Sequence, residues 1–243
     1  MGKENGFQQN PVLSNWVNLY NINNTIAQYS TVMLNDKVYL IGGHDGGSKS
    51  NRLRIFNPAN NSFSEGAPSP VAAQHRTAQA LDGKIFETGG WKPGNEGSKR
   101  TFSYDPTLDN WAEKSPTNFS RIVSTSIIFQ NKMWVVGGEN NSAEKVESYD
   151  SVSDNWIIEK SLLTGRKKAS CWVFENHLFV GGGEDVNGTI LDTIECYDPR
   201  TKSWYEWGKL ANPVSGCAAF VIGDMLHIFD GARTAGVLSL DLN

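Results

Sequence analysis

One spacing recurs around the whole chain. An aromatic residue precedes a glycine by the same interval of 27 residues five times. The pairs are Trp16 and Gly43, Phe63 and Gly90, Trp111 and Gly138, Trp156 and Gly183, and Trp204 and Gly231. Five copies of one supersecondary unit therefore fill most of the 243 residues. Because one copy cannot bury its own apolar face, the copies must pack on one another, and we expect a single domain over residues 1–243.

Each copy has the pattern of a four-stranded antiparallel meander. First strands of small or apolar residues are expected at 31–34, 78–81, 126–129, 171–174 and 218–222. Two-residue turns such as Asn35-Asp36 follow, and residues of this kind tolerate the positive φ of a tight hairpin. The second strand ends at glycines, where backbone comes close or turns sharply. The third strand carries a pair such as Tyr104-Asp105, and the fourth carries an aromatic residue seven positions later.

The glycine pair, the Tyr-Asp pair and the Trp at these spacings resemble the kelch motif, most closely in copies three and four. The resemblance implies an all-β fold, a five-bladed kelch β-propeller with one four-stranded antiparallel blade per repeat. Copy one departs from the motif with Phe56-Asn57, and copy five departs with Asp230-Gly231 and Leu240-Asp241. Kelch propellers more often have six blades, so a six-bladed ring, of which this chain is a fragment, is the alternative.

The two ends of the sequence complement each other. Copy five reaches Asn243 before its own fourth strand, whereas residues 14–18 (SNWVN) carry Trp16, which no other copy uses. We therefore expect the N-terminal strand to join the C-terminal blade and close the ring. Closure of this kind removes a free sheet edge and ties both ends together.

Composition excludes several classes of partner. Lys and Arg number 22 against 26 Asp and Glu, which argues against nucleic-acid binding by bulk charge. No apolar run approaches the roughly 18 residues that span a membrane, and the first residues lack the pattern of a signal peptide. Cys171, Cys196 and Cys217 lack metal or redox spacing, which is typical of buried free thiols in a reducing compartment. We expect a cytoplasmic, monomeric propeller.

The site is expected where loop length varies. The interval from the second glycine to the third-strand aromatic changes between copies, whereas the 27-residue segment does not. In an up-and-down blade the variable loops emerge on the same face as the blade-to-blade loops, at the mouth of the central channel, and this face is the predicted site. The candidate partner-binding residues are Tyr29, His44, Asp45, His75, Arg76, Trp91, Lys92, Glu139, Asn140, Lys168, Glu184, Asp185 and Arg233.

Two features rank these candidates. Trp91 is the best anchor, since Trp is enriched in interface hot spots, although packing against a neighbouring loop is the alternative. By resemblance to kelch domains that capture peptides, Arg76 is similar to the channel arginines, whereas Arg121 and Arg166 match the family's structural arginine. The charges also divide the predicted rim into a basic part and an acidic part, which favours a partner of mixed charge. The alternative is that these are ordinary solvated loop charges with no role in binding. The basic residues are Lys49, Arg52, Arg54, Lys92, Lys99 and Arg100, and the acidic ones are Glu139, Glu144, Glu184 and Asp185.

The sequence favours binding over catalysis. It contains no G-x-S-x-G, H-E-x-x-H, P-loop or Rossmann motif, so we expect no enzyme and no cofactor. His44, Asp45 and His75 could converge on the rim, but surface hydrogen bonding is preferred over a metal site. The predicted function is recognition of a peptide or protein segment. The resemblance to kelch-like proteins implies actin binding or the recruitment of substrates to a ubiquitin ligase. The second role would require residues outside this sequence or a partner, and a free-standing kelch protein is equally consistent. The alternative is a kelch-type enzyme or carbohydrate-binding propeller, in which Glu139, Glu184, Arg76 and Arg121 could serve.

Overall fold

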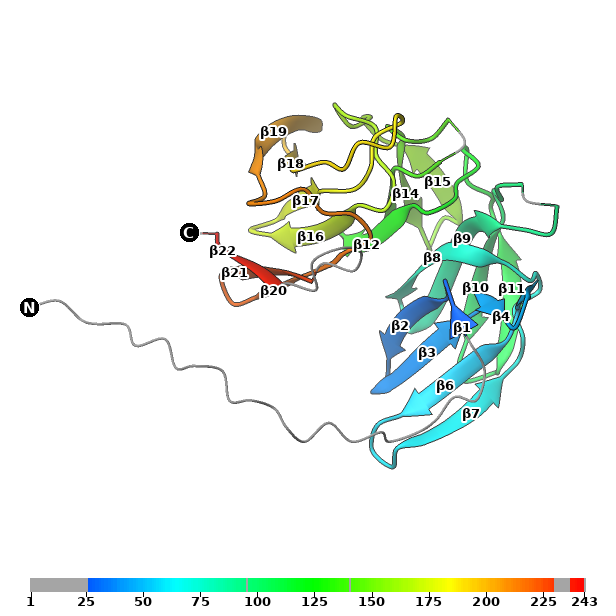
Figure 1. The fold of residues 1–243 in the computed structure, drawn as a ribbon. Helices are drawn as coiled ribbons and strands as arrows, with labels where there is room; N and C mark the ends of the chain where they lie inside the picture. Colours follow the sequence, from blue (N-terminus) through cyan, green and yellow to red (C-terminus); the bar gives the residue numbers. More distant parts are fainter. Residues whose placement is uncertain (1–25, 95, 140, 230–236, 243) are drawn as a thin grey trace, which may run out of the picture.

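The computed structural model describes residues 26–94, 96–139, 141–229 and 237–242. Regular secondary structure in these ranges consists of β-strands (Figure 1). This part of the chain contains no helix long and apolar enough to cross a membrane.

Five antiparallel sheets follow one another along the chain. The first contains β2 (Ser30–Leu34), β3 (Lys37–Ile41), β6 (Leu53–Asn57) and β7 (Ser62–Gly66). The second contains β8 (Gln74–Leu81), β9 (Lys84–Trp91), β10 (Thr101–Asp105) and β11 (Asn110–Lys114). The third contains β12 (Thr125–Phe129), β13 (Lys132–Val136), β14 (Val146–Asp150) and β15 (Asn155–Ile158).

The fourth sheet contains β16 (Ser170–Phe174), β17 (His177–Gly181), β18 (Thr193–Asp198) and β19 (Ser203–Lys209). The fifth has three strands among the described residues, β20 (Ala218–Ile222), β21 (Met225–Phe229) and β22 (Val237–Asp241). A small additional sheet joins β1 (Ile26–Ala27), β4 (His44–Asp45) and β5 (Ser48–Lys49).

The sheets are the blades of a five-bladed β-propeller, as the repeat predicts. The first strands of successive blades pack against one another in the order β2, β8, β12, β16 and β20. Figure 1 shows the blades in chain order, from the blue first blade to the red fifth blade. The predicted closing strand at 14–18 lies outside the described residues.

The tight turns between first and second strands are confirmed. Asn35 and Asp36 have φ of 50° and 57°, and Gln130 and Asn131 have φ of 49° and 56°. Positive φ at both central residues is the type I′ geometry, whose twist matches that of the flanking strands. Each turn therefore fixes the register of the hairpin that builds the inner half of its blade.

The glycine pairs join each blade to the next. In the third blade Gly138 donates its backbone N–H to the carbonyl of Arg166 at 3.0 Å. A Cβ on Gly137 would lie 2.2 Å from that same carbonyl oxygen, and the residue has φ of +66°. Both the close approach and the backbone conformation therefore require glycine.

The fourth-strand tryptophans pack between blades, as the periodicity predicts. Each indole N–H donates to a backbone carbonyl of the preceding blade: Trp111 to Ala67 at 2.8 Å, Trp156 to Ser115 at 2.9 Å and Trp204 to Lys160 at 2.9 Å. Each ring also lies 5.0–5.3 Å from the ring of the third-strand tyrosine opposite it. The aromatic pairs thus form the seams of the propeller.

The three cysteines are free thiols, but the prediction that they are buried holds in full only for Cys196. Cys196 is buried, and Cys171 and Cys217 are half-buried. Burial raises the pKa of the Cys171 thiol to about 12. A thiol with such a pKa stays protonated and unreactive at neutral pH.

Candidate functional site

A line of backbone hydrogen bonds connects the blades where the first strands begin. Five residues each precede the second glycine position of their blade by the same 15 residues: Gln28, His75, Val123, Lys168 and Gly216. The N–H of each of the last four donates to the carbonyl of the one before it, at 3.0, 3.4, 3.1 and 2.9 Å in chain order. We call these five residues the inner arc. It fixes the blade-to-blade segments relative to one another.

All five residues of the inner arc have a left-handed backbone, with φ between 53° and 66°. For Val123, whose side chain is β-branched, φ of 56° is a conformational outlier. Strained conformations persist where the surrounding structure determines them, and they cluster at binding sites. The surrounding structure therefore determines the backbone conformation of the inner arc, which continues into the predicted face.

His75 and Trp91 contact each other on the second blade. Their ring centroids lie 5.3 Å apart in an edge-on arrangement, and both side chains are half-buried. Burial lowers the pKa of His75, with an opposing effect of the Glu139 charge and a further lowering by Lys168. His75 is thus neutral at neutral pH and lies within electrostatic reach of the third and fourth blades. Trp91 thus packs against a residue of the adjacent strand of its own blade, and its role as an anchor stays a prediction.

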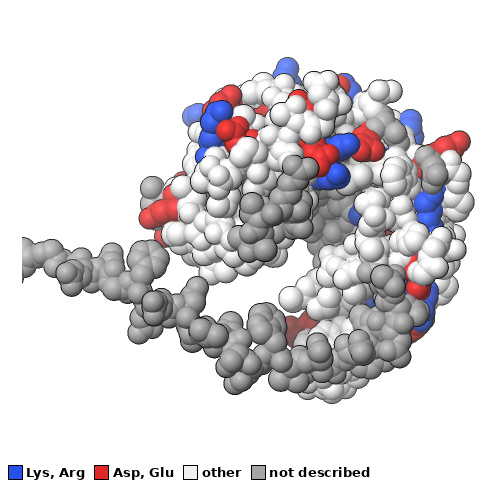
Figure 2. Space-filling view, in the orientation of Figure 1, with Lys and Arg blue, Asp and Glu red and all other residues white. Residues whose placement is uncertain are grey.

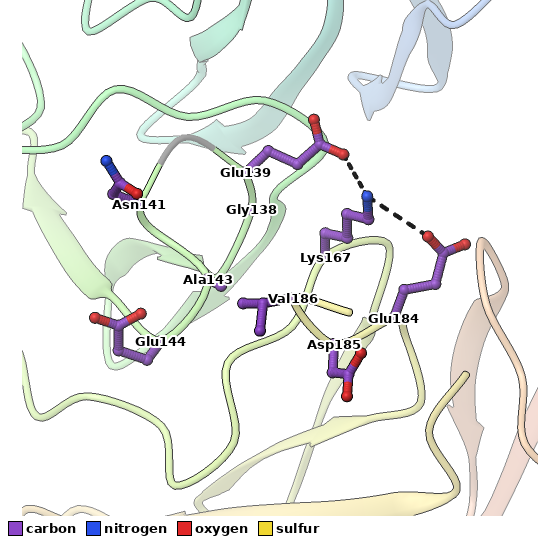
Figure 3. Close-up of a pocket in the computed structure, with 9 residues that line it drawn as sticks. All are labelled: Gly138, Glu139, Asn141, Ala143, Glu144, Lys167, Glu184, Asp185 and Val186. Carbon is purple, nitrogen blue, oxygen red and sulfur yellow. Dashed lines mark hydrogen bonds and ion pairs between the residues drawn. The ribbon is translucent and has the colours of Figure 1, made fainter. Parts of the chain in front are cut away.

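A cluster of alternating charges spans the third, fourth and fifth blades. The Lys167 ammonium lies 2.5 Å from Glu139 and 3.7 Å from Glu184. Dashed lines in Figure 3 mark these two ion pairs. Lys168 donates to both oxygens of Glu184 at 2.9 and 3.1 Å. The Ser215 hydroxyl donates to the same carboxylate at 2.8 Å. The structure therefore brings the predicted residues Glu139, Lys168 and Glu184 together around Lys167.

These contacts favour the charged forms of the cluster. The hydrogen bond to Glu139 raises the pKa of Lys167. Burial acts to raise the pKa of Glu184, but the hydrogen bonds from Lys168 and Ser215 hold it below its usual value. Both groups are therefore ionised at neutral pH.

A pocket of about 410 Å³ opens beside this cluster, between the loops that follow β13 and β17. We call it the acidic pocket (Figure 3). Its lining residues are Gly138, Glu139, Asn141, Ala143, Glu144, Lys167, Glu184, Asp185 and Val186. Four carboxylates and one ammonium group thus line the pocket, and Glu144 pairs with Lys145 at 2.7 Å. This volume is within the range of ligand-binding pockets.

The remaining acidic candidate stabilises its own loop. The Asp185 carboxylate accepts hydrogen bonds from the backbone N–H groups of Asn187 at 2.9 Å and Thr189 at 2.8 Å. These bonds lower the pKa of Asp185, the one from Thr189 most. The loop that carries Glu184 and Val186 is consequently held in shape by the acid that also lines the pocket.

One first-blade candidate, His44, lines a separate recess of about 450 Å³ together with residues such as Lys49 and Gln74. The Oε1 atom of Gln74 is buried and accepts no hydrogen bond. Lys49 donates to the Lys92 carbonyl at 3.0 Å. Tyr29, in the segment before β2, is 39% exposed. The rim of the first two blades thus presents polar groups apart from the acidic pocket.

The predicted division of the rim by charge is not what the structure shows. Basic side chains of the first two blades pair with local carboxylates: Arg54 with Asp45 at 2.9 Å, Lys92 with Glu96 at 2.9 Å and Arg100 with Glu113 at 2.8 Å. Figure 2 shows both signs of charge interspersed on the visible face. These local ion pairs neutralise the basic side chains that, in the sequence, make the rim of the first two blades look positively charged.

Two buried arginines have the structural role that the resemblance implies. Each arginine precedes the first strand of a blade and pairs with a glutamate on the third strand of that blade. Arg121 pairs with Glu147 of β14 at 2.9 Å, and Arg166 pairs with Glu195 of β18 at 2.5 Å. Both guanidinium groups also donate to backbone carbonyls across the glycine turn. All four side chains are at most 2% exposed.

Arg76, which the sequence placed at the binding rim, is buried in the same way. Its guanidinium forms an ion pair with the fully buried Glu87 and donates to the Ser69 hydroxyl at 2.9 Å. In this blade Ala73 and Phe102 occupy the positions of the arginine and glutamate used in blades three and four. Glu87 lies directly opposite Phe102 in the sheet, so the ion pair has moved by one strand. Arg76 therefore supports its blade and is unavailable to a partner.

Two further candidates, Asn140 and Arg233, lie outside the described residues. Within the described ranges, no three His, Cys, Asp or Glu side chains gather in a way that could hold a metal ion. His44 and Asp45 lie on the short strand β4, where Asp45 is paired with arginine.

Lys167, the centre of the charge cluster, belongs to the predicted face in sequence but is not among the selected candidates. A signal existed, because the corresponding residues of the four other blades are Ala27, Gln74, Ile122 and Ser215. A lysine at a position that is otherwise uncharged indicates a local role. Its carboxylate neighbours come from two different loops, which the spacing alone does not place together.

Comparison with known proteins finds similarity to proteins with kelch repeats. The family model described as Kelch motif matches residues 26–70 and 165–206. Kelch-like protein 35 of Mus musculus is 23% identical over 92% of this chain and 30% of its own length. Beta-scruin of Limulus polyphemus is 24% identical over 54% of this chain and 15% of its own length. The chain thus spans less than a third of these curated relatives.

The fold has a counterpart among solved structures. The structure of YjhT superposes with a TM-score of 0.75 at 15% sequence identity. The match covers 88% of this chain and 80% of that protein. At this identity the likeness concerns the fold alone.

Proposed function

Because this chain belongs to the kelch-repeat β-propeller family, we propose that it is a protein-interaction propeller whose partner binds in the acidic pocket. The observation that carries this proposal is the geometry of the pocket. Two variable loops from neighbouring blades form its walls, and the Lys167 ammonium lies between the carboxylates of Glu139 and Glu184. Loops held by a rigid scaffold bind with little ordering cost.

The charge of the pocket favours a basic segment of the partner. A guanidinium or ammonium group entering the pocket would meet Asp185, the Lys167 cluster and Glu144, which it would share with Lys145 at 2.7 Å. Charge-assisted hydrogen bonds of this kind are about twice as strong as neutral ones. The exposed Val186 side chain at the wall supplies apolar contact for the stem of such a residue.

The resemblance to kelch-like proteins suggests what kind of protein the bound segment belongs to. We infer first that the bound segment belongs to a substrate of a cullin-based ubiquitin ligase, because copies three and four are most similar to kelch-like proteins. Actin binding is the second candidate role. Identification of the captured protein separates these two roles.

The experiment compares capture of proteins from lysate by the wild-type chain and by Glu139→Gln. This substitution keeps the shape of the side chain but removes one carboxylate from the pocket. We expect capture of the specific partner to fall about tenfold, which corresponds to roughly 1.4 kcal/mol for one lost charge-assisted contact.

Glu113→Gln is the matched control, since Glu113 is also an acid paired with a basic side chain but lies on the outer strand β11. It should capture the partner as the wild type does. Equal capture by all three proteins would move the binding surface away from the acidic pocket.

A further inference from the structure

In the second and third blades, the third-strand tyrosine donates its hydroxyl to an aspartate of the turn that follows. Tyr104 donates to Asp109 at 2.7 Å. Tyr149 donates to Asp154 at 2.6 Å. Each aspartate lies five residues after its tyrosine and has a left-handed backbone, with φ of 48° and 49°. The tyrosine of each of these blades thus has an acceptor within its own blade.

The same carboxylates also bind the preceding blade. Asp109 accepts the backbone N–H of Ala67 at 2.7 Å. Asp154 accepts the backbone N–H of Ser115 at 3.0 Å. The carbonyls of Ala67 and Ser115 in turn accept an indole N–H from the next blade. One carboxylate therefore satisfies a tyrosine hydroxyl and a backbone N–H at each of these two interfaces.

The fourth blade has both donors but lacks the carboxylate. Five residues after its tyrosine, Tyr197, the turn carries Lys202, with φ of 52°. The equivalent backbone N–H belongs to Lys160, whose carbonyl accepts the Trp204 indole N–H at 2.9 Å. Within the described residues, neither the Tyr197 hydroxyl nor the Lys160 N–H has a hydrogen-bond acceptor. Because buried polar groups are normally hydrogen-bonded and Tyr197 is 3% exposed, these donors indicate a place for an acceptor from outside the chain.

A pocket of about 250 Å³ opens at this interface, and Tyr197 and Lys202 are among its lining residues. The exposed Lys202 forms no ion pair in the part of the chain that the structure describes. Lys132, also on the wall, lies 3.4 Å from Asp150. The indole N–H of Trp134, another lining residue, is buried and has no acceptor among the described groups. The wall thus combines hydrogen-bond donors with positive charge, which favours an anion.

Glu159, which also lines the pocket, does not replace the missing carboxylate. It accepts the hydroxyl of Ser148 at 2.7 Å. Burial raises the pKa of Tyr197, and the charge of Glu159 raises it further. The Tyr197 hydroxyl therefore stays protonated at neutral pH and is able to donate.

We propose that this pocket binds the carboxylate of a ligand, in the place that Asp109 and Asp154 take in the two preceding blades. The ligand carboxylate accepts the Tyr197 hydroxyl and the Lys160 N–H, and the Lys202 ammonium offsets its charge. Hydrogen bonds to an ionised acceptor are about twice as strong as neutral ones. The pocket includes residues of the turns after β12 and β18, at the end of the blades opposite the acidic pocket, so this inference is independent of the proposed partner.

The test is a titration of the isotope-labelled full chain, followed by amide NMR, with an aspartate residue capped at both ends. We expect the Lys160 amide to shift downfield, because the probe carboxylate accepts its proton. The Ser115 amide is the internal control and should not move, since Asp154 already binds it. N-acetylglycine, which carries only a terminal carboxylate, separates a chain terminus from an acidic side chain as the source, and the tighter probe assigns it. Equal Lys160 shifts with a capped asparagine, or no shift with either carboxylate, would overturn the proposal.

Lys202→Asp returns the carboxylate to the chain. It should weaken binding of the tighter probe about tenfold relative to Lys202→Gly and raise the melting temperature above that of Lys202→Gly. Glycine is the matched control, because it accepts the left-handed backbone, removes the same ammonium group and leaves the place open. Tyr197→Phe should also weaken the probe, since it removes one donor. Equal affinity in the two Lys202 variants, or unchanged affinity in Tyr197→Phe, would overturn the proposal.

Discussion

At the scale of residues, Arg76 and Glu87 neutralise each other in the buried part of the second blade. Arg76→Ala would leave the Glu87 carboxylate unpaired and out of contact with water. We expect a loss of about 3 kcal/mol in the free energy of unfolding, since breaking one partner of a buried ion pair has this cost. Urea denaturation followed by circular dichroism measures it.

The double variant Arg76→Met with Glu87→Leu is the control for this prediction. It removes both charges and fills the volume with apolar atoms, so it should be more stable than Arg76→Ala. If Arg76→Ala unfolds at the same urea concentration as the wild type, the buried ion pair does not contribute as described.

The buried arginines show which structural roles could be predicted from the sequence and which could not. The spacing gave Arg121 and Arg166 a structural role, and their burial agrees with it. Arg76 is at another position of its copy, so the pattern did not reveal its equivalent role. Its partner Glu87 lies on the second strand rather than the third. The buried glutamate has moved from the third strand to the opposite position on the second strand, Glu87. Only the packing of the two strands shows that these positions are equivalent, and the spacing of the repeat does not.

At the scale of elements, the turn after β13 depends on glycine for two separable reasons. Gly137→Ala would force a Cβ against the Arg166 carbonyl oxygen, 2.2 Å away, at φ of +66°. We expect a loss of about 3 kcal/mol, which combines backbone strain of about 1–2 kcal/mol with overpacking. A thermal melt of the purified variant would show it.

Gly188→Ala separates the two reasons. Gly188 has φ of +83°, but a Cβ there would meet no atom within 4 Å. This variant should lose only the strain component, about 1–2 kcal/mol. Equal losses in both variants would mean that the close approach of the blades has no energetic effect.

The elements themselves were the most predictable part of the fold. The first strands expected at 31–34, 126–129, 171–174 and 218–222 lie within or match observed strands. Alternation and turn residues determine such hairpins locally. The acidic pocket was predictable only in part, because Glu139 and Glu184 follow the glycines whereas Ala143 and Val186 depend on loop shape.

At the scale of the whole molecule, the inner arc and the tryptophan seams hold the blades as one platform. Backbone hydrogen bonds from Gln28 through Gly216 connect all five blades at the level of the site. The acidic pocket therefore has fixed walls although its lining belongs to loops of two blades. A partner binding there meets a preformed surface, and this is the central claim of the account.

A photo-crosslinking amino acid at position 186 tests this claim most directly. Val186 is 79% exposed and lines the pocket, whereas Val152 is 93% exposed on the turn between β14 and β15. Alternate loops of a meander emerge at opposite ends of the blade, so position 152 is the matched control. Illumination in lysate should join position 186, but not 152, to a protein whose crosslinked peptide contains Lys or Arg. Equal adducts from both positions, or adducts from 152 alone, would contradict it.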